Sequence, residues 1–349
     1  MAKVIQWATG NTGSLALQAV VESADLELVG VRVYDEHKRG RDAGELIGQA
    51  PVGVVATSDT AEILATEADV VLYMGNVERN REACFADVET LLASGKNVVA
   101  TGSSFIDPRA FDATLGDRLA AACDRGNSTF LGVGLFPGFW GESVGALLTR
   151  LSFRCGTLSV RETLSYAAYP SRELMFDMMG YGYAPDDPTP VLSDPSNVGG
   201  GFIGTVTVLA KALGLDVRSV SPFRDTATTD RRLEVAAGII EPGTVAAMRI
   251  GIRADCGPVR LVVEHITRMA PDIAPDWPID EGYEIELDGV PSMRCHLLLG
   301  IHGEEHSQMG CWATAMHAVH AIPAVIAAPP GVLDLAAFGS FLAPGSRTS

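Results

Sequence analysis

Hydrophobic and polar positions follow two different patterns along the chain. Up to about residue 140, short uninterrupted apolar runs alternate with amphipathic stretches, which is typical of buried parallel strands joined by helices. Beyond residue 140, apolar and polar residues alternate one by one, which favours a sheet with one buried face. We therefore predict an α/β protein, with a doubly wound parallel domain over residues 1–140 and an α+β domain over 141–310 on an open mixed or antiparallel sheet.

The predicted elements follow these patterns. The strands of the first domain are expected at 4–7, 26–33, 52–57, 68–75, 97–100 and 129–133. Its helices are expected from Ser14, from an N-cap at Thr60, over 88–94 and from Pro108 to near Gly126. Strands of the second domain are expected at 158–167, 231–240, 244–254, 259–269, 283–289 and 293–300, and helices from Ser171 and Gly200. An apolar helix near 311–330 is expected to pack back on the first domain, followed by a loose tail after Phe341.

The turn between the first strand and the first helix is rich in small residues: Thr9, Gly10, Asn11, Thr12 and Gly13. Glycines at such a turn let backbone amides approach a pyrophosphate at the positive end of a helix. A single GxxG also occurs in ordinary turns, and the glycine that a full fingerprint places near Trp7 or Ala8 is missing. The surrounding α/β pattern nevertheless favours a dinucleotide site.

The end of the second strand bears on the choice between NAD and NADP. An NAD-specific fold places an acidic residue there to bind the ribose hydroxyls, but this chain has Val33 and Tyr34, with Asp35 just beyond. The basic residues His37, Lys38 and Arg39 follow, and they favour a 2′-phosphate. We expect NADP(H) to be preferred and NAD(H) to be possible, although a solvated basic loop would look the same.

Residues that follow later strands are expected to border the nicotinamide, because ligands bind outside the carboxyl ends of parallel strands. These residues are Met74, Gly75, Asn76, Thr101 and Gly102.

Composition narrows the possible partners. The formal net charge of −17 argues against nucleic acid and anionic membrane surfaces. Six scattered cysteines without a CxxC pair, and the lack of a leader or of a long uninterrupted apolar run, predict a cytoplasmic protein with free thiols. No motif points to a metal site.

Several motifs together resemble the dihydrodipicolinate-reductase-like oxidoreductases, in the branch with 2,4-diaminopentanoate dehydrogenase and the native amine dehydrogenases. They are TGNTG, GLFPGF, AAGIIEPGTVAAMRI, APDWP, PSMRC and TAMHAVHAIPAVIAAPPG. The resemblance implies an N-terminal Rossmann domain, a second α+β domain with the substrate pocket and the contact of a homodimer, and NAD(P)-dependent hydride transfer at an amine-bearing carbon.

The chain departs from that pattern in two places. The His-His and Lys motif of true dihydrodipicolinate reductases is missing. The glutamate that the resemblance places after the fifth strand is replaced by Ser103 and Ser104, and a hydroxyl carries no charge to hold an ammonium.

Candidate proton donors are therefore Ser104 and Glu142, the second of which lies at the predicted hinge between the domains. Further candidates are the phenols Tyr166, Tyr169 and Tyr183, and His265 on an alternating strand, with His296 behind it. Each of these has an ordinary structural alternative, as a helix cap, a core tyrosine or a sheet histidine.

Apolar walls for a substrate are expected from Phe139, Trp140, Tyr166, Phe176 and Met179, although core packing explains such side chains equally well. The resulting hypothesis is an NAD(P)-dependent oxidoreductase that interconverts a small hydrophobic carbonyl or imine with its amine. One alternative is an NADP(H)-dependent ketone/alcohol oxidoreductase, which the serines favour. Another is a catalytically silent cofactor-binding protein.

Overall fold

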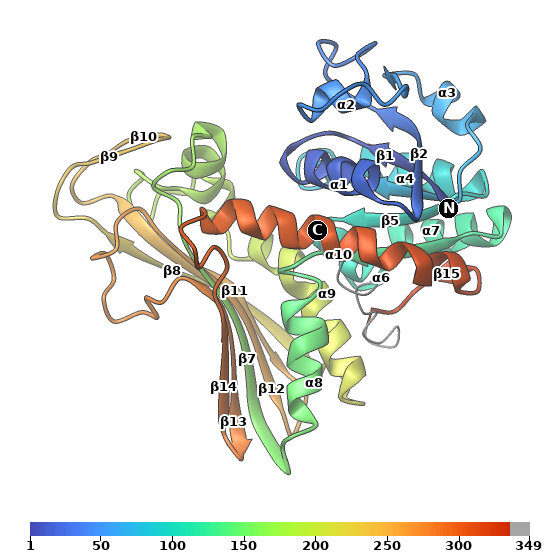
Figure 1. Ribbon diagram of the computed structural model, residues 1–349. Coiled ribbons are helices and arrows are strands. Elements are labelled where there is room, and N and C mark those ends of the chain that lie inside the picture. Colours follow the sequence, from blue (N-terminus) through green and yellow to red (C-terminus); the bar gives the residue numbers. More distant parts are fainter. Residues whose placement is uncertain (336–349) are drawn as a thin grey trace. The chain divides into compact units, whose positions relative to one another are not determined.

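The computed structural model describes residues 1–335, which form two compact units (Figure 1). The N-terminal unit is Met1–Ser143 with the chain from Gln308 onward, and the second unit is Val144–Ser307. The observed division lies three residues from the expected one at each boundary, 143 against 140 and 308 against 311. The tail predicted after Phe341 lies outside the described residues.

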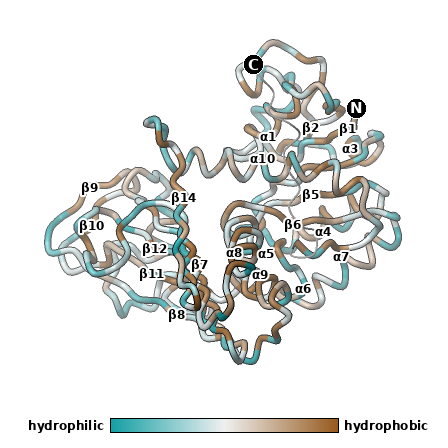
Figure 2. The backbone as a smooth tube through the Cα atoms, turned by 60° about the horizontal axis from the view of Figure 1, so that its bottom comes forward, coloured by the Kyte–Doolittle hydropathy of each residue, from teal (hydrophilic) through white to brown (hydrophobic). Residues whose placement is uncertain are grey.

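A seven-stranded parallel sheet forms the centre of the N-terminal unit, with the order β15-β6-β5-β4-β1-β2-β3. Its strands are β1 (Ala2–Trp7), β2 (Leu26–Arg32), β3 (Ala56–Thr57), β4 (Val70–Tyr73), β5 (Asn97–Thr101), β6 (Thr129–Val133) and β15 (Gly331–Val332). The apolar run of β5 is brown in Figure 2, as expected for a strand buried on both faces. The order reverses between β1 and β4, which is where doubly wound sheets bind ligands.

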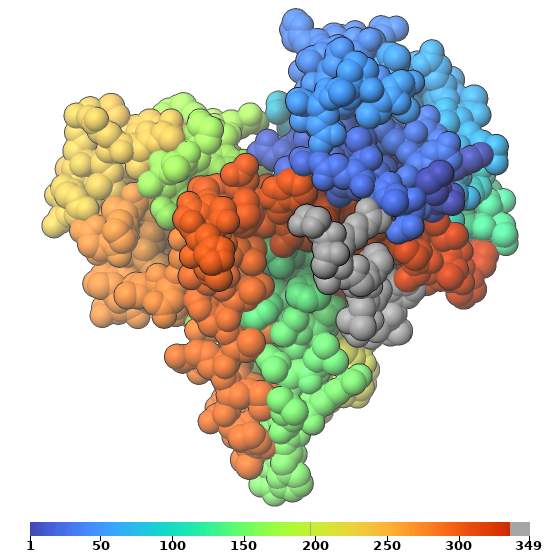
Figure 3. All heavy atoms as spheres, in the orientation of Figure 1, coloured from blue at the N-terminus to red at the C-terminus, as the bar shows by residue number. Residues whose placement is uncertain are grey.

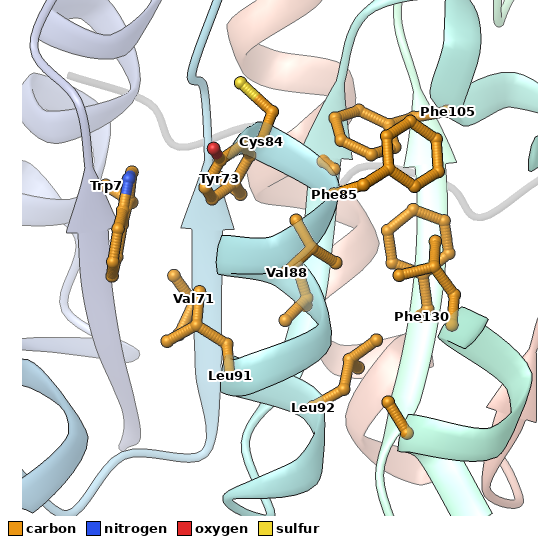
Figure 4. Packing of buried hydrophobic residues seen from close by; sticks show 14 of the residues in the cluster. Trp7, Val71, Tyr73, Cys84, Phe85, Val88, Leu91, Leu92, Phe105 and Phe130 are labelled. Carbon is orange, nitrogen blue, oxygen red and sulfur yellow. The ribbon is translucent and has the colours of Figure 1, made fainter. Parts of the chain in front are cut away.

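Helices connect these strands. They are α1 (Asn11–Glu22), α2 (Ala43–Leu46), α3 (Thr60–Ala65), α4 (Arg81–Ala93), α5 (Ser103–Ile106), α6 (Pro108–Phe111), α7 (Ala113–Gly126) and α10 (His306–Ala327). One core lies between α4, α7 and the sheet, and its aromatic rings contact one another in tilted and edge-on pairs (Figure 4). Phe85 and Phe105 are 4.8 Å apart between ring centroids, and Trp7 and Tyr73 are 5.6 Å apart. These contacts fix the ends of β1, β4 and β5, where the candidate site lies.

Several local expectations for this unit need correction. Helix α1 begins at Asn11 rather than Ser14, and β3 is only two residues long because Val52 and Val55 are exposed. The N-cap of α3 is Asp59, whose carboxylate accepts the Ala61 amide, rather than Thr60. The segment after β5 is not a loop, since α5 begins at Ser103.

The second unit contains a six-stranded mixed sheet with the order β14-β13-β7-β12-β11-β8. Its strands are β7 (Arg154–Ser165), β8 (Ser219–Thr228), β11 (Val245–Asp255), β12 (Arg260–Arg268), β13 (Gly282–Val290) and β14 (Met293–Leu297). Strands β7 and β12 are parallel and the other neighbours are antiparallel. The sequence did not predict β8, and the expected strand at 231–240 is a small hairpin, β9 (Leu233–Val235) with β10 (Gly238–Ile240).

Short helical segments accompany this sheet. They are η1 (Trp140–Gly145), α8 (Ala146–Thr149), η2 (Glu173–Met179), η3 (Val191–Ser193) and α9 (Ser196–Ala212). Helix α9 packs on β8, β11 and β12 and begins four residues before the expected Gly200. The methionine-rich helix expected from Ser171 is the π-helix η2.

Helix α10 belongs with the N-terminal unit from Gln308 onward, and the red end of this segment is visible in Figure 3. Among the described residues it is also the one helix long and apolar enough to cross a membrane by length and composition alone. Its side chains Ala315, Ala318 and Ile322 are fully buried, and 39% of its most apolar stretch is buried in all.

Candidate functional site

The glycine turn, residues 9–13, joins β1 to α1 and has a shape that suits a pyrophosphate. A Cβ atom on Gly13 would lie 2.3 Å from the Ala8 carbonyl oxygen, so glycine alone lets α1 approach β1 this closely. A Cβ atom on Gly10 would meet no atom within 4 Å, so the backbone there faces open space. The free amides at the start of α1 therefore remain accessible to phosphate oxygens.

The glycine missing from the fingerprint has a structural counterpart. Ala8 has a φ of 71°, a left-handed conformation that glycine adopts more readily. The side-chain amide of buried Gln6 donates a hydrogen bond of 2.8 Å to the Ala8 carbonyl oxygen and supports this conformation. The turn thus keeps the glycine-type backbone without the glycine, and sequence inspection did not identify the role of Gln6.

Lys38 lies at the glycine turn. Its Nζ atom is 2.6 Å from the Thr9 carbonyl oxygen and 3.2 Å from the Thr9 hydroxyl. Thr9 is itself buried, and its carbonyl oxygen also accepts the Ser14 hydroxyl. An ammonium at this position adds positive charge beside the start of α1.

The end of β2 carries the other residues predicted for the ribose. The Tyr34 hydroxyl accepts the Trp7 indole N–H at 2.8 Å and donates to Asp87, and burial raises the pKa of Tyr34. The Asp35 carboxylate accepts the His37 amide at 2.9 Å, and Arg39 forms an exposed ion pair of 3.6 Å with Glu36. This edge therefore exposes His37 and Arg39, with the Asp35 carboxylate bound to the local backbone and the Glu36 carboxylate paired with Arg39.

A cavity of about 330 Å³ opens at the carboxyl ends of β4, β5 and β6, and we call it the strand-end cavity. It is lined by Gly75, Asn76, Val77, Glu78, Thr101, Gly102, Ser103, Gly134, Leu135, Phe136, Pro137 and Thr314. The structure thus brings together four of the five residues predicted to border the nicotinamide. Met74, the fifth, does not line the cavity.

Glu78 is the carboxylate of this cavity, and sequence inspection did not identify it. Its Oε1 atom accepts the Ser103 hydroxyl at 2.6 Å and the Ser103 amide at 3.0 Å. A charge-assisted bond from a hydroxyl and a second bond from the backbone fix the orientation of the carboxylate. The polar loop after β4 could have indicated a carboxylate near the cavity. Its pairing with Ser103 could not be predicted, because the two residues are 25 positions apart in the sequence.

Ser104 and Glu142 do not line the strand-end cavity. Ser104 is 1% exposed, and its hydroxyl has no hydrogen-bond partner among the described residues. Glu142 is equally buried, and its Oε2 atom accepts the amide of Gly138 at 2.9 Å. This bond closes the turn in which Gly138 has a φ of 130°, so the structure gives Glu142 a contact typical of a turn-stabilising residue.

The residues after β6 contact α10. The Nδ1 atom of His317 is 2.8 Å from the carbonyl oxygen of Gly134, and Phe139 packs edge-on against the His317 ring. Burial lowers the pKa of His317, so the imidazole is neutral near pH 7 and Nδ1 carries the donated hydrogen. Trp140 is buried, whereas Phe139 keeps 37% of its surface exposed.

A second polar cluster lies within the second unit and contains three of the residues predicted for catalysis or substrate binding. His265 on β12 is opposite Glu162 on β7, and its Nδ1 atom is 2.7 Å from the Glu162 carboxylate. Its Nε2 atom is 3.2 Å from the Tyr166 hydroxyl. The ring of Tyr169 lies 5.7 Å from that of Tyr166. Glu162 was not predicted, because a single sequence does not reveal which strands pair.

Phe176 and Met179, predicted as substrate walls, are buried in the core of the second unit with Met175 and Tyr181. The His296 ring contacts the Glu281 carbonyl oxygen at 3.0 Å. Among residues 1–335, no group of three His, Cys, Asp or Glu side chains is placed to hold a metal ion.

Comparison with known proteins covers both units. Residues 3–107 match the N-terminal domain of dihydrodipicolinate reductase, and residues 173–342 match the C-terminal domain of 2,4-diaminopentanoate dehydrogenase. An amine dehydrogenase of Streptomyces virginiae is 30% identical over 96% of this chain and 95% of its own length.

Solved structures share the fold. An amine dehydrogenase from Mycobacterium smegmatis superposes with a TM-score of 0.75 at 19% identity, over 96% of this chain and 95% of that one. A biliverdin reductase from Synechocystis, solved with biliverdin and NADP+, has a TM-score of 0.55 at 13% identity, over 97% and 94% of the two chains. At these identities the likeness concerns the fold.

Proposed function

Because this chain belongs to the dihydrodipicolinate-reductase-like oxidoreductases, in the branch of the amine dehydrogenases, and is an NAD(P)-dependent oxidoreductase, we propose that it catalyses reductive amination. The substrate class we propose is a small to medium hydrophobic ketone or aldehyde, with ammonia as the nitrogen donor and NADP(H) as the preferred cofactor. The reverse reaction, oxidation of the amine, uses the same groups.

The observation that carries this proposal is the Glu78 carboxylate in the strand-end cavity. Amine chemistry needs a negative charge beside an ammonium or iminium, and the serines after β5 cannot supply one. Ser103 instead donates two hydrogen bonds to Glu78, which supplies the charge from the neighbouring loop after β4. The family resemblance places a glutamate after β5. In this chain Ser103 stands there and binds the carboxylate of Glu78, which follows β4 instead.

The residues present fit a nicotinamide dinucleotide. The amides at the start of α1 would hold its pyrophosphate, and the strand-end cavity would receive its nicotinamide end. The bound cofactor supplies or accepts the hydride. The exposed side chains of His37 and Arg39 after β2 support a preference for the 2′-phosphate, for which the Arg39 guanidinium would exchange its exposed partner Glu36.

The walls of the strand-end cavity support a hydrophobic substrate. Val77, Leu135, Phe136 and Pro137 line it on the apolar side, and no arginine or lysine is among the lining residues. The carboxylates of a dicarboxylate substrate would have no positively charged partner among the lining residues, whereas a hydrophobic ketone or aldehyde would bury apolar surface against them. The homodimer and the cytoplasmic location stay predictions.

The test follows oxidation of NADPH and of NADH with a panel of hydrophobic ketones and aldehydes, each with and without excess ammonium. We expect turnover to require ammonium, and Glu78→Gln to lower it by about 10²-fold or more because the charge at the iminium is lost. Glu82→Gln is the matched control. It removes an exposed carboxylate on α4 that is paired with Arg118 on α7, and it should leave turnover unchanged.

A result in which turnover ignores ammonium would instead support a ketone/alcohol oxidoreductase, for which the Ser103 hydroxyl in the cavity is the favouring observation. If Glu78→Gln and Glu82→Gln lost turnover to the same extent, Glu78 would have no specific role in the reaction.

A further inference from the structure

We propose that the aromatic ring of Tyr34 is a stacking platform for the adenine base of the cofactor. The inference rests on the proposed function for the identity of that cofactor, a nicotinamide dinucleotide, and makes no use of the amination chemistry. All the residues that carry it lie in the N-terminal unit. The ligand class assigned to the Tyr34 ring is a planar purine base.

Tyr34 is exposed and yet held in place. It keeps 53% of its surface exposed. Its hydroxyl accepts the indole N–H of Trp7 at 2.8 Å and donates to the Asp87 carboxylate at 3.1 Å. A surface tyrosine with a free hydroxyl changes rotamer readily, whereas two hydrogen bonds at the end of the side chain keep this ring in one orientation.

One face of the Tyr34 ring is covered by a cation. The Arg32 guanidinium lies over the ring, with its carbon atom 4.4 Å from the ring centroid, and it also lies over the Trp7 ring at 5.3 Å. Arg32 Nη1 donates to the Val33 carbonyl oxygen, which holds the guanidinium there. Because a cation is attracted to the face of an aromatic ring, this contact stabilises the arrangement. The opposite face of the ring is the one that remains for a ligand.

Asp87 connects the platform to the core of the unit. Its Oδ2 atom accepts the Tyr34 hydroxyl and also the Tyr73 hydroxyl, the latter at 3.0 Å. Tyr73 on β4 and Trp7 on β1 are fully buried neighbours, with ring centroids 5.6 Å apart (Figure 4). The Tyr34 ring is therefore anchored to two strands and, through Asp87, to α4. A ring that is already ordered loses little conformational entropy when a ligand stacks on it.

The platform lies beside the turn that suits the pyrophosphate. Strands β1 and β2 are parallel neighbours, and the Ala8 amide donates to the Arg32 carbonyl oxygen at 2.9 Å. Tyr34 follows two residues later, just beyond the end of β2. In doubly wound folds the adenosine half of a dinucleotide extends from the pyrophosphate toward this strand end. The strand-end cavity lies at β4, β5 and β6 and suits the nicotinamide end, so the base that reaches Tyr34 is the adenine.

A purely structural role is the competing explanation. Trp7 is fully buried, and its indole N–H needs an acceptor, which the Tyr34 hydroxyl supplies. That role depends on the hydroxyl and does not require an exposed ring. Tyr34→Phe keeps the ring and loses the hydroxyl, whereas Tyr34→Gln keeps an acceptor group and loses the ring. The two explanations therefore predict opposite rankings for these variants.

The experiment measures Kd for 2′,5′-ADP, which contains the adenine and the 2′-phosphate, by calorimetric titration of the full-length protein. We expect Tyr34→Leu and Tyr34→Gln to weaken binding by about tenfold or more, because stacking of the base on an aromatic ring is lost. Tyr34→Phe should stay within about threefold of the wild-type Kd, since its ring still stacks. The same ratios are expected for 5′-ADP, which keeps the adenine and lacks the 2′-phosphate.

Phe153→Leu is the matched control. Phe153 is 78% exposed, and the Arg154 guanidinium lies over its ring at 5.1 Å, as Arg32 lies over Tyr34. It belongs to the second unit, and no aromatic acceptor or glycine turn is assigned to it, so Phe153→Leu should leave both Kd values unchanged. Urea denaturation of every variant establishes that the protein titrated is folded.

A spectroscopic readout does not depend on affinity. A base stacked on a tyrosine ring lowers the near-ultraviolet absorbance of the pair. At saturating 2′,5′-ADP this decrease should be present in wild type and in Phe153→Leu, and it should be lost in Tyr34→Leu. A decrease that survives in Tyr34→Leu would place the base elsewhere and overturn the proposal.

The binding data can also overturn it. Equal Kd values for 2′,5′-ADP in wild type and Tyr34→Leu would show that the ring contributes nothing. A loss in Tyr34→Phe as large as that in Tyr34→Leu would assign the effect to the hydroxyl and thus to the structural role. A loss confined to 2′,5′-ADP and absent with 5′-ADP would mean that Tyr34 acts on the 2′-phosphate rather than on the base.

The outcomes are distinguishable from those of the proposed function. Turnover that ignores ammonium would end reductive amination and leave the platform in place, because the binding of 2′,5′-ADP does not involve the nitrogen donor. If wild type binds NADPH and Tyr34→Leu binds 2′,5′-ADP equally well, the platform alone is overturned. If wild type binds neither NADPH nor 2′,5′-ADP, the cofactor assignment and the platform fail together.

Discussion

The two sheets of this protein use polar residues in opposite ways. In the parallel sheet of the N-terminal unit, every residue of β4 and β6 is buried. Apart from Thr314 on α10, the residues that line the strand-end cavity lie at or beyond the ends of the strands. In the mixed sheet of the second unit, polar and charged side chains lie within the strands themselves. Glu162, His265 and Glu264 are all interior positions of β7 and β12.

The difference follows from whether a charge within a strand finds a partner. Helices cover both faces of a parallel sheet, so a charge within a strand would be desolvated without a partner. In the mixed sheet, opposite charges on neighbouring strands face each other, so a charge can be buried together with its partner. Glu264 shows the extreme case, since its carboxylate bonds to Arg161 at 2.5 Å and to Arg249 at 2.7 Å although its side chain is only 1% exposed.

The largest effect that would test this comparison is expected at Glu264. Replacing Glu264 with Gln leaves Arg249 and part of Arg161 without a counter-charge in a buried position, so the free energy of unfolding should fall by about 3 kcal/mol. Urea denaturation measures the change. Asp272→Asn is the control, because its ion pair with Arg231 is exposed to solvent and should contribute little to the free energy of unfolding. Equal effects would mean that burial of the charges does not govern their contribution.

A smaller effect is expected at the glycine turn, where the parallel sheet meets its ligand. Gly13→Ala forces a Cβ atom against the Ala8 carbonyl oxygen, so α1 must move away from β1 and the protein should lose about 1–3 kcal/mol of stability. NADPH binding, measured by fluorescence titration, should weaken as well. Gly10→Ala has open space for its methyl group and should change stability by less than about 0.5 kcal/mol. Similar losses in both variants would contradict the packing role assigned to Gly13.

The smallest effect concerns His317, which links α10 to the end of β6. Burial holds its pKa below the value of the unfolded chain, so the unfolded state binds the proton more readily. Stability is therefore complete above pH 6.5 or so and declines as pH falls below it, by at most about 1.4 kcal/mol per pH unit for one proton. His317→Asn keeps a donor for the Gly134 carbonyl oxygen but cannot titrate, so its stability should decline less between pH 7 and pH 5. Identical slopes in thermal unfolding at these pH values would show that His317 does not contribute.

Local sequence was sufficient for much of the fold. The continuous apolar runs located five of the six expected parallel strands to within a few residues, and the alternating runs located most of the second sheet. The exceptions were short or polar elements. Strand β3 is exposed over most of the predicted run, and β8 carries few buried side chains, so neither has the apolar pattern that identifies a strand.

The family resemblance and the glycine turn also followed from the sequence, because each depends on residues that are adjacent in the chain. The sequence likewise identified Gly75, Asn76, Thr101 and Gly102, since the carboxyl ends of parallel strands meet at one edge whatever the details of the loops.

Only the tertiary structure decided which side chains meet. Glu78 reaches Ser103 because β4 and β5 are neighbours, and Glu162 meets His265 because β7 and β12 pair in one particular register. Ser104 and Ser103 are equally placed by sequence, but the turn of α5 buries the first and directs the second to the cavity. Local patterns reflect interactions between near neighbours in the chain, whereas register and side-chain direction are fixed by the packing of the whole domain.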